Sequence, residues 1–404
     1  MAHPKVLAFV LAGGKGERLF PLTAFRSKPA VPFGGRYRIV DFVLSNLVNS
    51  QIFSIYLLVQ YKSQSLIEHI RQQWVMSPII RDHFVAVVPP QMRMGPEWFQ
   101  GTADAVFQNI NLINHHNPGL VIVFGADHIY RMDIRQMIDF HLIKGADVTV
   151  AARPVPVEEA SAFGVIQTDS ENRIIGFQEK PETPTPMPSD PSRAYVSMGN
   201  YIFTTDVLVN ALIEAQHKKH HDFGAHILPS LVQTGRLFAY DFESNIIPGT
   251  KPYEEKGYWR DVGTIKAFFD AHMDLLGETP PFELNNPQWP IYPSGQKAPA
   301  TKILHAEIEN SMISEGVTIH KNVTIKNSVI RTGVVIEDNA VVEDSIIMDF
   351  SVIKRGCHLK NVIVDKMNVI KEGAKIGFDP RDERFGLHID SSGIRVIPRK
   401  GWRD

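Results

Sequence analysis

A short loop of glycines and cations, residues 13–18, directly follows the first apolar run of the chain and has the residue types that bind phosphate. Its three glycines permit main-chain conformations that bring N–H groups close to an anion. Lys15 adds a mobile positive charge, and Arg18 adds a planar one suited to phosphate oxygens. The loop is not a dinucleotide fingerprint, because Leu19 takes the third glycine position, and it lacks the Gly-Lys-Ser/Thr end of a P-loop. An ordinary strand-to-helix turn is the alternative.

Two carboxylates stand where a divalent cation could join that phosphate. Asp127 comes directly after the hydrophobic run 120–125, and Asp261 lies just ahead of a predicted helix. Mg²⁺ is a hard cation that proteins usually hold with one or two carboxylates plus phosphate oxygens and water. It would neutralise charge on a transferred phosphoryl group and on leaving pyrophosphate. The alternative for Asp127 is the N-cap of a helix.

Two further pairs of neighbouring residues have ligand-binding chemistry. Glu179 and Lys180 end a strand, where Lys180 could pair with a phosphate while Glu179 accepts hydrogen bonds from sugar hydroxyls. The alternative for this pair is an exposed ion pair beside a turn proline. Gly101 would permit close approach of a ligand, and Thr102 could cap a helix or contact a base.

Basic and imidazole side chains gather in two more stretches. Residues 26–38 offer a phosphate or anionic effector site, with a solvated basic loop as the alternative. The cations of this stretch are Arg26, Lys28, Arg36 and Arg38. Residues 217–226 contain four histidines and no cysteine, at a spacing that fits no closed zinc site, so a polar helix end is favoured. These histidines are His217, His220, His221 and His226.

Up to about Leu276, short apolar runs alternate with helical patterns, which predicts a layered, Rossmann-like α/β domain with a mainly parallel sheet. The predicted strands are 6–11, 55–60, 84–88, 120–125 and 147–153. The predicted helices are 63–73, 103–114, 133–143, 206–216 and 264–276. Ligands of such sheets sit beyond the carboxyl ends of the strands, which places the loop 13–18 and Asp127 on one edge.

A repeat begins after a proline-rich stretch, 277–302, which we interpret as an extended linker. Four units of 17 residues span 312–379, with aliphatic residues at the same three positions in each. Spacings of six, six and five residues predict a left-handed parallel β-helix with three short strands per coil. A two-sheet sandwich, the alternative, would not keep so regular a period. The columns are Ile313, Ile330, Ile347 and Val364; Ile319, Ile336, Ile353 and Ile370; and Ile325, Val342, Leu359 and Ile376.

Composition and patterning together set the broad class of the 404-residue chain. We expect an α/β domain at 1–276, the linker at 277–302, and a β-helix domain with a C-terminal extension at 303–404. A formal net charge of -2 argues against nucleic acid or anionic membrane as a partner. The single Cys357 excludes an internal disulfide and fits a reducing compartment. Met1 to Pro4 lead straight into the first strand and no apolar stretch could span a bilayer, so we expect a cytoplasmic protein without a signal peptide.

Several motifs along the chain match a known family. They are Lys28-Pro29-Ala30-Val31, Phe33-Gly34-Gly35-Arg36-Tyr37-Arg38-Ile39-Val40-Asp41, Gly101-Thr102-Ala103-Asp104-Ala105-Val106, Ala160-Ser161-Ala162-Phe163-Gly164-Val165, His221-Asp222-Phe223-Gly224 and Tyr258-Trp259-Arg260-Asp261-Val262-Gly263. The segment 11–19 is shared with the wider superfamily of sugar-nucleotide pyrophosphorylases. Over nearly its whole length the sequence resembles the ADP-glucose pyrophosphorylases (glucose-1-phosphate adenylyltransferases) of bacterial glycogen synthesis.

The resemblance implies that 1–276 is a nucleotidyltransferase domain that makes ADP-glucose and pyrophosphate from ATP and glucose 1-phosphate with Mg²⁺. This reaction is the first step of glycogen or α-glucan synthesis. In-line attack on the α-phosphorus needs no covalent intermediate, so alignment and charge neutralisation would supply the catalysis. The implied catalytic residues are Arg18, Lys28 and Asp127. The implied nucleotide ligands are Leu11, Gly13, Gly14, Lys15, Gly101 and Thr102. The sugar phosphate would meet Glu179, Lys180, Ser197 and Trp259, and the metal would meet Asp127 and Asp261.

Regulation and assembly are expected from the same resemblance. Arg26, Arg38 and Arg384 match cations of effector pockets, which implies regulation by anionic metabolites. Phe25 replaces a lysine that enteric-type enzymes use for fructose 1,6-bisphosphate, so the activator would differ or the response would be weak. Phe99 stands where an aromatic residue near the nucleotide is expected. The family suggests a homotetramer built through both domains. Two other interpretations stay open: a non-catalytic regulatory subunit, and a uridylyl or thymidylyl transferase.

Overall fold

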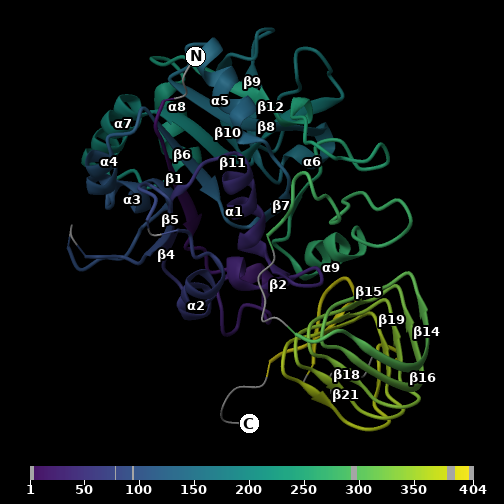
Figure 1. The fold of residues 1–404 in the computed structure, drawn as a ribbon. Helices are drawn as coiled ribbons and strands as arrows, with labels where there is room; N and C mark the ends of the chain where they lie inside the picture. Colours follow the sequence, from purple (N-terminus) through teal and green to yellow (C-terminus); the bar gives the residue numbers. More distant parts are fainter. Residues whose placement is uncertain (1–3, 78, 93–94, 293–297, 380–386, 400–404) are drawn as a thin grey trace.

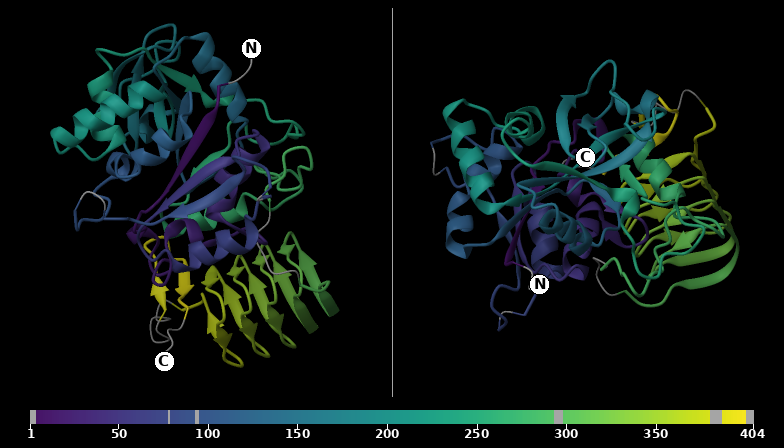
Figure 2. Two further views of the ribbon diagram at one scale, coloured as in Figure 1. Left: turned by 60° about the vertical axis from the view of Figure 1, so that its left-hand side comes forward. Right: turned by 90° about the horizontal axis from the view of Figure 1, so that it is seen from above.

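The computed structural model describes residues 4–77, 79–92, 95–292, 298–379 and 387–399. Figure 1 shows two bodies, a layered α/β body and, below it, a β-helix of stacked strands drawn in green to yellow. In Figure 2 the strands of the β-helix stand in series along its length. The prediction of an α/β domain followed by a β-helix is confirmed.

The first strand, β1 (Val6–Ala12), lies inside a nine-stranded sheet because it is apolar on both faces. It pairs in parallel with β4 (Ser54–Val59) and with β6 (Leu120–Gly125). On its far side β4 pairs in parallel with β5 (Phe84–Val88). These four strands therefore end on one edge, and the glycine loop leaves β1 at that edge.

The rest of the sheet is mostly antiparallel, which makes the sheet mixed. Its central strand β11 (Arg193–Thr204) runs antiparallel to β6, to β8 (Val148–Pro156) and to β9 (Gly164–Thr168). The edge strand β10 (Ile174–Glu179) is antiparallel to β9, whereas β12 (Leu237–Asp241) runs parallel to β8. The predicted parallel character thus holds for the part of the sheet that carries the candidate site.

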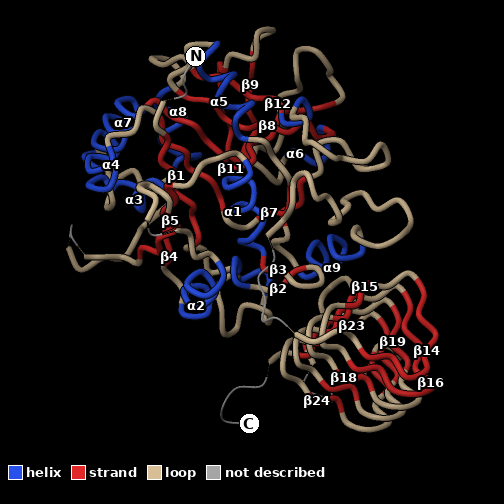
Figure 3. The backbone as a smooth tube through the Cα atoms, viewed as in Figure 1, coloured by secondary structure: helices blue, strands red, loops and turns tan. Residues whose placement is uncertain are grey.

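Helices cover both faces of the sheet (Figure 3). The side chains of β1 alternate between the two resulting cores. One core includes residues of α1 (Ile39–Asn49), α2 (Gln64–Gln73) and α5 (Ile134–Ile143). The other includes residues of α3 (Thr102–Phe107), α4 (Ile110–His116) and α7 (Thr205–His217). The remaining helices are α6 (Val157–Ala160), α8 (Leu228–Leu231) and α9 (Ile265–Met273). Within the described ranges, no helix has the length and apolar character needed to cross a membrane.

Two helices differ from the sequence-based expectation for physical reasons. The helix α1 was not predicted, because residues 39–47 are all buried and the segment lacks the polar face that gives a helical period. The single helix predicted at 103–114 is two helices, α3 and α4. They separate at Asn109, whose side-chain amide donates to the Ala105 carbonyl at 2.8 Å and competes with the main chain.

The predicted columns of the β-helix are stacked strands. Ile313, Ile330, Ile347 and Val364 follow one another in the parallel register of β15 (Met312–Ile313), β17 (Val329–Ile330), β20 (Ile346–Ile347) and β23 (Val362–Val364). The second and third columns stack likewise through β16 (Thr318–Lys326), β18 (Val335–Ile336), β19 (Val341–Glu343), β21 (Val352–Ile353), β22 (His358–Lys360), β24 (Val369–Ile370) and β25 (Lys375–Ile376). Pairing also extends beyond the four predicted units: β14 (Lys302–Glu309) precedes them, and β27 (Arg395–Ile397), flanked by β26 (His388–Ile389), covers β23.

Residues 277–292, here called the strap, contain no helix or strand but are not the extended linker that was predicted. Phe282, Trp289 and Ile291 are 2%, 3% and 3% exposed, because these apolar side chains pack into the α/β body. Hydrogen bonds fix the strap along α1, from Asn49 Nδ2 to the Pro290 carbonyl at 2.9 Å and from the Tyr292 N–H to Ser45 Oγ at 2.9 Å. The prolines therefore prevent regular structure while the residues between them anchor the chain.

The β-helix is also bonded directly to the α/β body. Arg331 donates to the Phe33 carbonyl at 2.8 Å, and Ser314 Oγ donates to the Gly35 carbonyl at 2.7 Å. One hydrophobic core contains residues of both bodies, among them Phe33 and Ile346. Residues 26–38 consequently lie between the β-helix and the edge of the sheet where the parallel strands end.

Candidate active site

A cavity of about 800 Å³ opens at the carboxyl ends of β1, β4 and β6. This is the edge at which the sequence places a ligand. Most of the expected site residues line it: Leu11, Gly13, Gly14, Lys15, Arg18, Lys28, Gly101, Thr102, Asp127, Glu179 and Ser197. Three expected residues, Lys180, Trp259 and Asp261, are not among the lining residues, and Phe99 is.

The glycine loop is an open turn followed by one turn of 3₁₀ helix at Glu17–Leu19, not by an α-helix. Gly16 has φ of 66°, and a Cβ there would come within 3.0 Å of the side chains of Thr23 and Lys28. A Cβ at Gly14 would meet no atom within 4 Å, so this main chain faces open space. Leu19 is 0% exposed, and its apolar packing explains why no third fingerprint glycine stands there.

The main electrostatic feature of the cavity is a cluster of one lysine between two carboxylates. Lys28 Nζ lies 2.7 Å from Asp261 Oδ1 and 3.1 Å from Asp127 Oδ2, and the lysine side chain is 8% exposed. Burial disfavours the charge on both Lys28 and Asp127, but their attraction outweighs it. Asp127 and Asp261 therefore raise the pKa of Lys28, and His128 together with Lys28 holds the pKa of Asp127 well below its usual range. Lys28 and Asp127 are therefore both charged near neutral pH.

A two-stranded ribbon brings the two carboxylates together. β7 (His128–Tyr130) pairs antiparallel with β13 (Trp259–Asp261), and Asp261 is the direct partner of His128. Ligand atoms of Asp127, His128 and Asp261 all lie within 4.8 Å of one another, so these residues could hold a metal ion. Nδ1 of His128 is buried without a hydrogen-bond partner, which fits a group that would be completed by a cation. Among the described residues, this is the group of histidines, cysteines and carboxylates whose geometry could hold a metal ion.

The observed helix ends decide whether Asp127 caps a helix and whether Asp261 lies ahead of one. Asp127 is not an N-cap, because α5 begins after Asp133, whose side chain accepts from the Arg135 N–H at 3.1 Å. Thr264 caps α9 through the Ala267 N–H at 3.1 Å, which leaves Asp261 outside the helix as predicted. His128 was missed by the sequence analysis. Its position beside Asp127 was visible, but its pairing with Asp261 depends on the ribbon.

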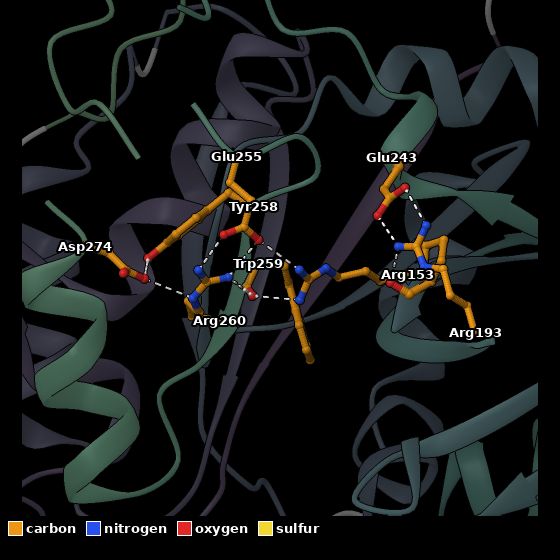
Figure 4. A network of polar contacts seen from close by, with 9 residues as sticks. Arg153, Arg193, Glu243, Glu255, Tyr258, Trp259, Arg260 and Asp274 are labelled. Carbon is orange, nitrogen blue, oxygen red and sulfur yellow. Dashed lines mark hydrogen bonds and ion pairs between the residues drawn. The ribbon is translucent and has the colours of Figure 1, made fainter. Parts of the chain in front are cut away.

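A charged network holds the outer side of β13 (Figure 4). Glu255 lies between two arginines, accepting from Arg153 Nη2 at 2.9 Å and from Arg260 Nη1 and Nη2 at 2.9 and 2.6 Å. Arg260 Nε also donates to Asp274 at 3.0 Å, and Arg153 Nη1 donates to the Trp259 carbonyl at 3.3 Å. Because successive strand residues face opposite sides, fixing Arg260 outward turns Asp261 toward Lys28.

The expected sugar-phosphate residues lie on the far side of the cavity or beneath it. Glu179 ends β10 and lines the cavity with its side chain 46% exposed. Lys180 follows with φ of 47°, its Nζ 3.5 Å from Glu179 and its side chain 65% exposed, as in the alternative of a surface ion pair. Trp259 is 3% exposed and packs against the His128 ring with centroids 4.8 Å apart. It therefore supports the metal ribbon from below.

The reason for a glycine at 101 differs from the expectation. A Cβ at Gly101 would collide with the main chain of His221, so packing within the protein excludes a side chain there. The His221 carbonyl accepts from the Ala103 N–H at 2.9 Å and satisfies the start of α3. Thr102 Oγ1 donates to Asp222 Oδ2 at 2.9 Å, which also brings Asp222 to the cavity wall.

The cavity wall includes Gln60, a residue that the sequence analysis did not single out. It follows β4 at the same edge as the glycine loop, which is the only signal the sequence offers. Gln60 Nε2 donates to the Phe99 carbonyl at 3.2 Å, and its Oε1 is buried without a partner. The orientation of the amide is thus set by Phe99, and one acceptor remains for a ligand.

The cations expected to bind effectors lie between the two bodies. Arg26 is 3% exposed and pairs with Asp365 of the β-helix. Arg38 is the N-cap of α1 and donates to the Ser65 carbonyl at 2.8 Å. Burial and the neighbouring arginines 26, 38 and 399 lower the pKa of Lys366 to about 8. Arg384 lies outside the described residues.

Comparisons with known proteins agree with this geometry. The nucleotidyl transferase family model matches residues 7–278, and the model for a GlmU-like C-terminal hexapeptide domain matches residues 297–397. The chain is 66% identical to a glucose-1-phosphate adenylyltransferase of Thermodesulfovibrio yellowstonii over 397 residues, 98% of this chain and 96% of the relative. It is 50% identical to that of Anaeromyxobacter dehalogenans (99% and 98%) and 49% identical to that of Thermus thermophilus (79% and 80%). The chain therefore belongs to the nucleotidyl transferase family, among the glucose-1-phosphate adenylyltransferases.

Proposed function

We propose that this protein transfers the adenylyl group of ATP to glucose 1-phosphate, giving ADP-glucose and pyrophosphate in one Mg²⁺-dependent step. The observation that carries the proposal is the arrangement of one cavity, in which an open glycine loop faces a buried lysine between two carboxylates. The names of the relatives identify the two substrates. The reaction begins the synthesis of glycogen or another α-glucan.

Asp127 and Asp261, with His128 beside them, would hold the Mg²⁺ ion. When bound, the ion would neutralise charge on the α-phosphoryl group and on the departing pyrophosphate. Lys15 and Arg18 are exposed at the mouth of the cavity, where their ion pairs with Glu17 at 3.7 Å and with Asp261 at 3.8 Å are long enough to yield to a triphosphate. A phosphate oxygen of glucose 1-phosphate would form the new bond to the α-phosphorus while the bond to pyrophosphate breaks. No protein nucleophile is needed, and the residues act by alignment and charge.

The sugar phosphate would bind on the side of the cavity formed by β10 and β11. Glu179 would accept hydrogen bonds from sugar hydroxyls, and Ser197 lies on the same wall. The exposed ammonium of Lys180 would turn from Glu179 toward the phosphate, where a doubly charged partner is stronger than a surface carboxylate. Trp259 would act from beneath by supporting His128.

The adenine ring would bind in the part of the cavity lined by Leu11, Gly101 and Thr102. Gln60, which lines the same cavity, supports adenine as the base. Its unpartnered Oε1 is an acceptor, which matches the exocyclic amino group of adenine. Uracil and thymine present a carbonyl oxygen at the corresponding position of their ring, and two acceptors would repel each other. We therefore expect ATP to be preferred over UTP and dTTP.

The experiment is a pyrophosphate-release assay with the purified full chain, glucose 1-phosphate and Mg²⁺. We expect ATP to react at least about tenfold faster than UTP or dTTP, a difference of about 1.4 kcal/mol in activation free energy. Equal rates with UTP would overturn the adenylyl assignment. Activity only after addition of a second protein would favour a regulatory subunit instead.

We also propose that an anionic metabolite regulates the reaction by binding between the two bodies. What supports this is the gathering of Arg26, Arg38, Lys366 and Arg399, whose closeness adds to burial in lowering the pKa of Lys366. A panel of sugar phosphates and pyruvate in the same assay tests the idea. Arg38→Ala should reduce any response more than it changes the basal rate; an undiminished response would place the effector elsewhere.

Two further expectations remain part of the proposal. A homotetramer built through both bodies is expected from the resemblance to the family, and sedimentation of the purified chain tests it. A cytoplasmic location is supported by the single cysteine and by the use of ATP.

A further inference from the structure

Lys28 lies between the two carboxylates that could hold a divalent cation. Its Nζ is 2.7 Å from Asp261 Oδ1 and 3.1 Å from Asp127 Oδ2, both within the range of a charge-assisted hydrogen bond. The ligand atoms of Asp127, His128 and Asp261 lie within 4.8 Å of one another. A metal ion bound to both carboxylates would therefore stand within a few ångströms of the ammonium group.

The lysine is held in this position by its surroundings. It begins the 3₁₀ turn Lys28–Ala30, whose second residue is Pro29, and its side chain is 8% exposed. Gly16 lies against the Cβ atom of Lys28. A Cβ added at Gly16 would be 3.0 Å from that atom, so the glycine loop packs tightly on the base of the lysine side chain. Arg18 Nη2 approaches Asp261 Oδ2 at 3.8 Å, so a second cation faces the same carboxylate. Both carboxylates thus have a cationic partner supplied by the chain.

We propose that Lys28 is an internal counter-ion that excludes divalent metal from the site until a triphosphate arrives. A divalent cation and an ammonium ion at such a distance repel each other, and the burial of the Lys28 side chain limits the screening of its charge by solvent. The phosphates of the nucleotide, which enter beside the glycine loop, attract Lys28 and Arg18 and free the carboxylates for the metal. The inference rests on the proposed metal and nucleotide sites, and it makes Lys28 the residue that couples them.

The test measures Mn²⁺ binding to the full-length protein by electron paramagnetic resonance, with no nucleotide present. Lys28→Met should bind Mn²⁺ at least about tenfold more tightly than the wild type, because the competing charge is gone. Lys28→Arg, which keeps the charge, and Lys15→Met, which removes an exposed lysine of the same cavity, should both bind Mn²⁺ as weakly as the wild type. Equal or weaker binding by Lys28→Met would overturn the proposal.

A second readout guards against loss of the fold in Lys28→Met. Mn²⁺ alone should raise the unfolding temperature of Lys28→Met, and of the milder Lys28→Gln, but not that of the wild type. Adding Asp127→Asn to Lys28→Met should abolish this stabilisation. A rise of equal size in the wild type would contradict the role of Lys28.

Addition of ATP without sugar phosphate should reverse the order of the Mn²⁺ affinities of the wild type and Lys28→Met. The wild type should then bind Mn²⁺ more tightly than Lys28→Met, since the lysine now contacts phosphate. A wild type whose Mn²⁺ affinity does not respond to ATP would refute the proposed nucleotide site, while the nucleotide-free comparison still decides the role of Lys28. Tighter binding by Lys28→Met both with and without ATP would refute the transfer of Lys28 to the phosphates.

Discussion

Replacing Glu255 by glutamine should weaken metal binding without touching the cavity. Glu255 holds the outer side of β13 by accepting one hydrogen bond from Arg153 and two from Arg260. Glu255→Gln keeps the shape of the side chain but removes the charge between two guanidinium groups. Asp261, the next residue after Arg260, then loses the support that turns it toward Lys28.

The size of the effect follows from these contacts. A hydrogen bond to a charged group contributes about 1.5–3 kcal/mol. The side chains of Arg153, Arg260 and Glu255 remain 19%, 29% and 32% exposed, so solvent screens part of that energy. We expect a loss of about 2 kcal/mol in the free energy of unfolding. Mutation of a group that orients a metal ligand typically lowers metal affinity by about 10–100-fold. The Mg²⁺ concentration for half-maximal activity of Glu255→Gln should therefore rise by about tenfold or more.

Glu243 provides a matched control. It accepts two hydrogen bonds from Arg193 next to the same network, at 3.2 and 2.5 Å, but neither residue is bonded to β13 (Figure 4). Urea unfolding should show a comparable loss of stability for Glu243→Gln and Glu255→Gln. Titration of pyrophosphate release with Mg²⁺ should shift only for Glu255→Gln. Identical Mg²⁺ titrations for the two variants would refute the argument that the network positions Asp261.

Four other outcomes are expected. Asp127→Asn should lower kcat by about 100-fold or more while the unfolding curve stays in place; unchanged activity would locate the metal elsewhere. Lys180→Ala should raise KM for glucose 1-phosphate far more than KM for ATP, and the opposite pattern would remove Lys180 from the sugar site. Gln60→Ala should reduce the ratio of the ATP rate to the UTP rate, whereas an unchanged ratio would show that the amide does not read the base. Burial lowers the pKa of His272 from 6.5 to about 3, so its contribution to the free energy of unfolding is complete above pH 6.5 and falls below that pH by up to about 1.4 kcal/mol per pH unit. The free energy of unfolding of His272→Gln, measured in urea, should depend less on pH than that of the wild type. Equal pH dependence of the two proteins would refute this.

Features that depend on local pattern could be predicted from the sequence. The aliphatic columns of the β-helix repeat at a fixed period, so the sequence itself shows which residues of neighbouring coils are aligned. The strand–loop boundary at residue 12 is marked by the change from apolar residues to glycines. The expectation that Asp127 and the glycine loop share an edge required only that β1 and β6 be parallel neighbours.

Features that depend on contacts between distant segments could not be predicted from the sequence. The pairing of Lys28 with Asp261 joins residues that are 233 positions apart. The need for glycine at position 101 comes from the main chain of His221, which no local rule indicates. The helix α1 is hidden because burial on all sides removes the polar face. Part of its cover comes from the strap, where Trp289 Nε1 donates to Asn46 Oδ1 at 3.4 Å.

The strap bears on how such proteins exchange parts during evolution. The two family models match 7–278 and 297–397 and leave most of the strap to neither. Yet Phe282, Trp289 and Ile291 are built into the α/β body, and Tyr292 is bonded to Ser45. A β-helix inherited from another protein and joined at residue 278 would expose the seat of these side chains to water. Recombination that preserves these contacts must therefore carry the strap together with the α/β body.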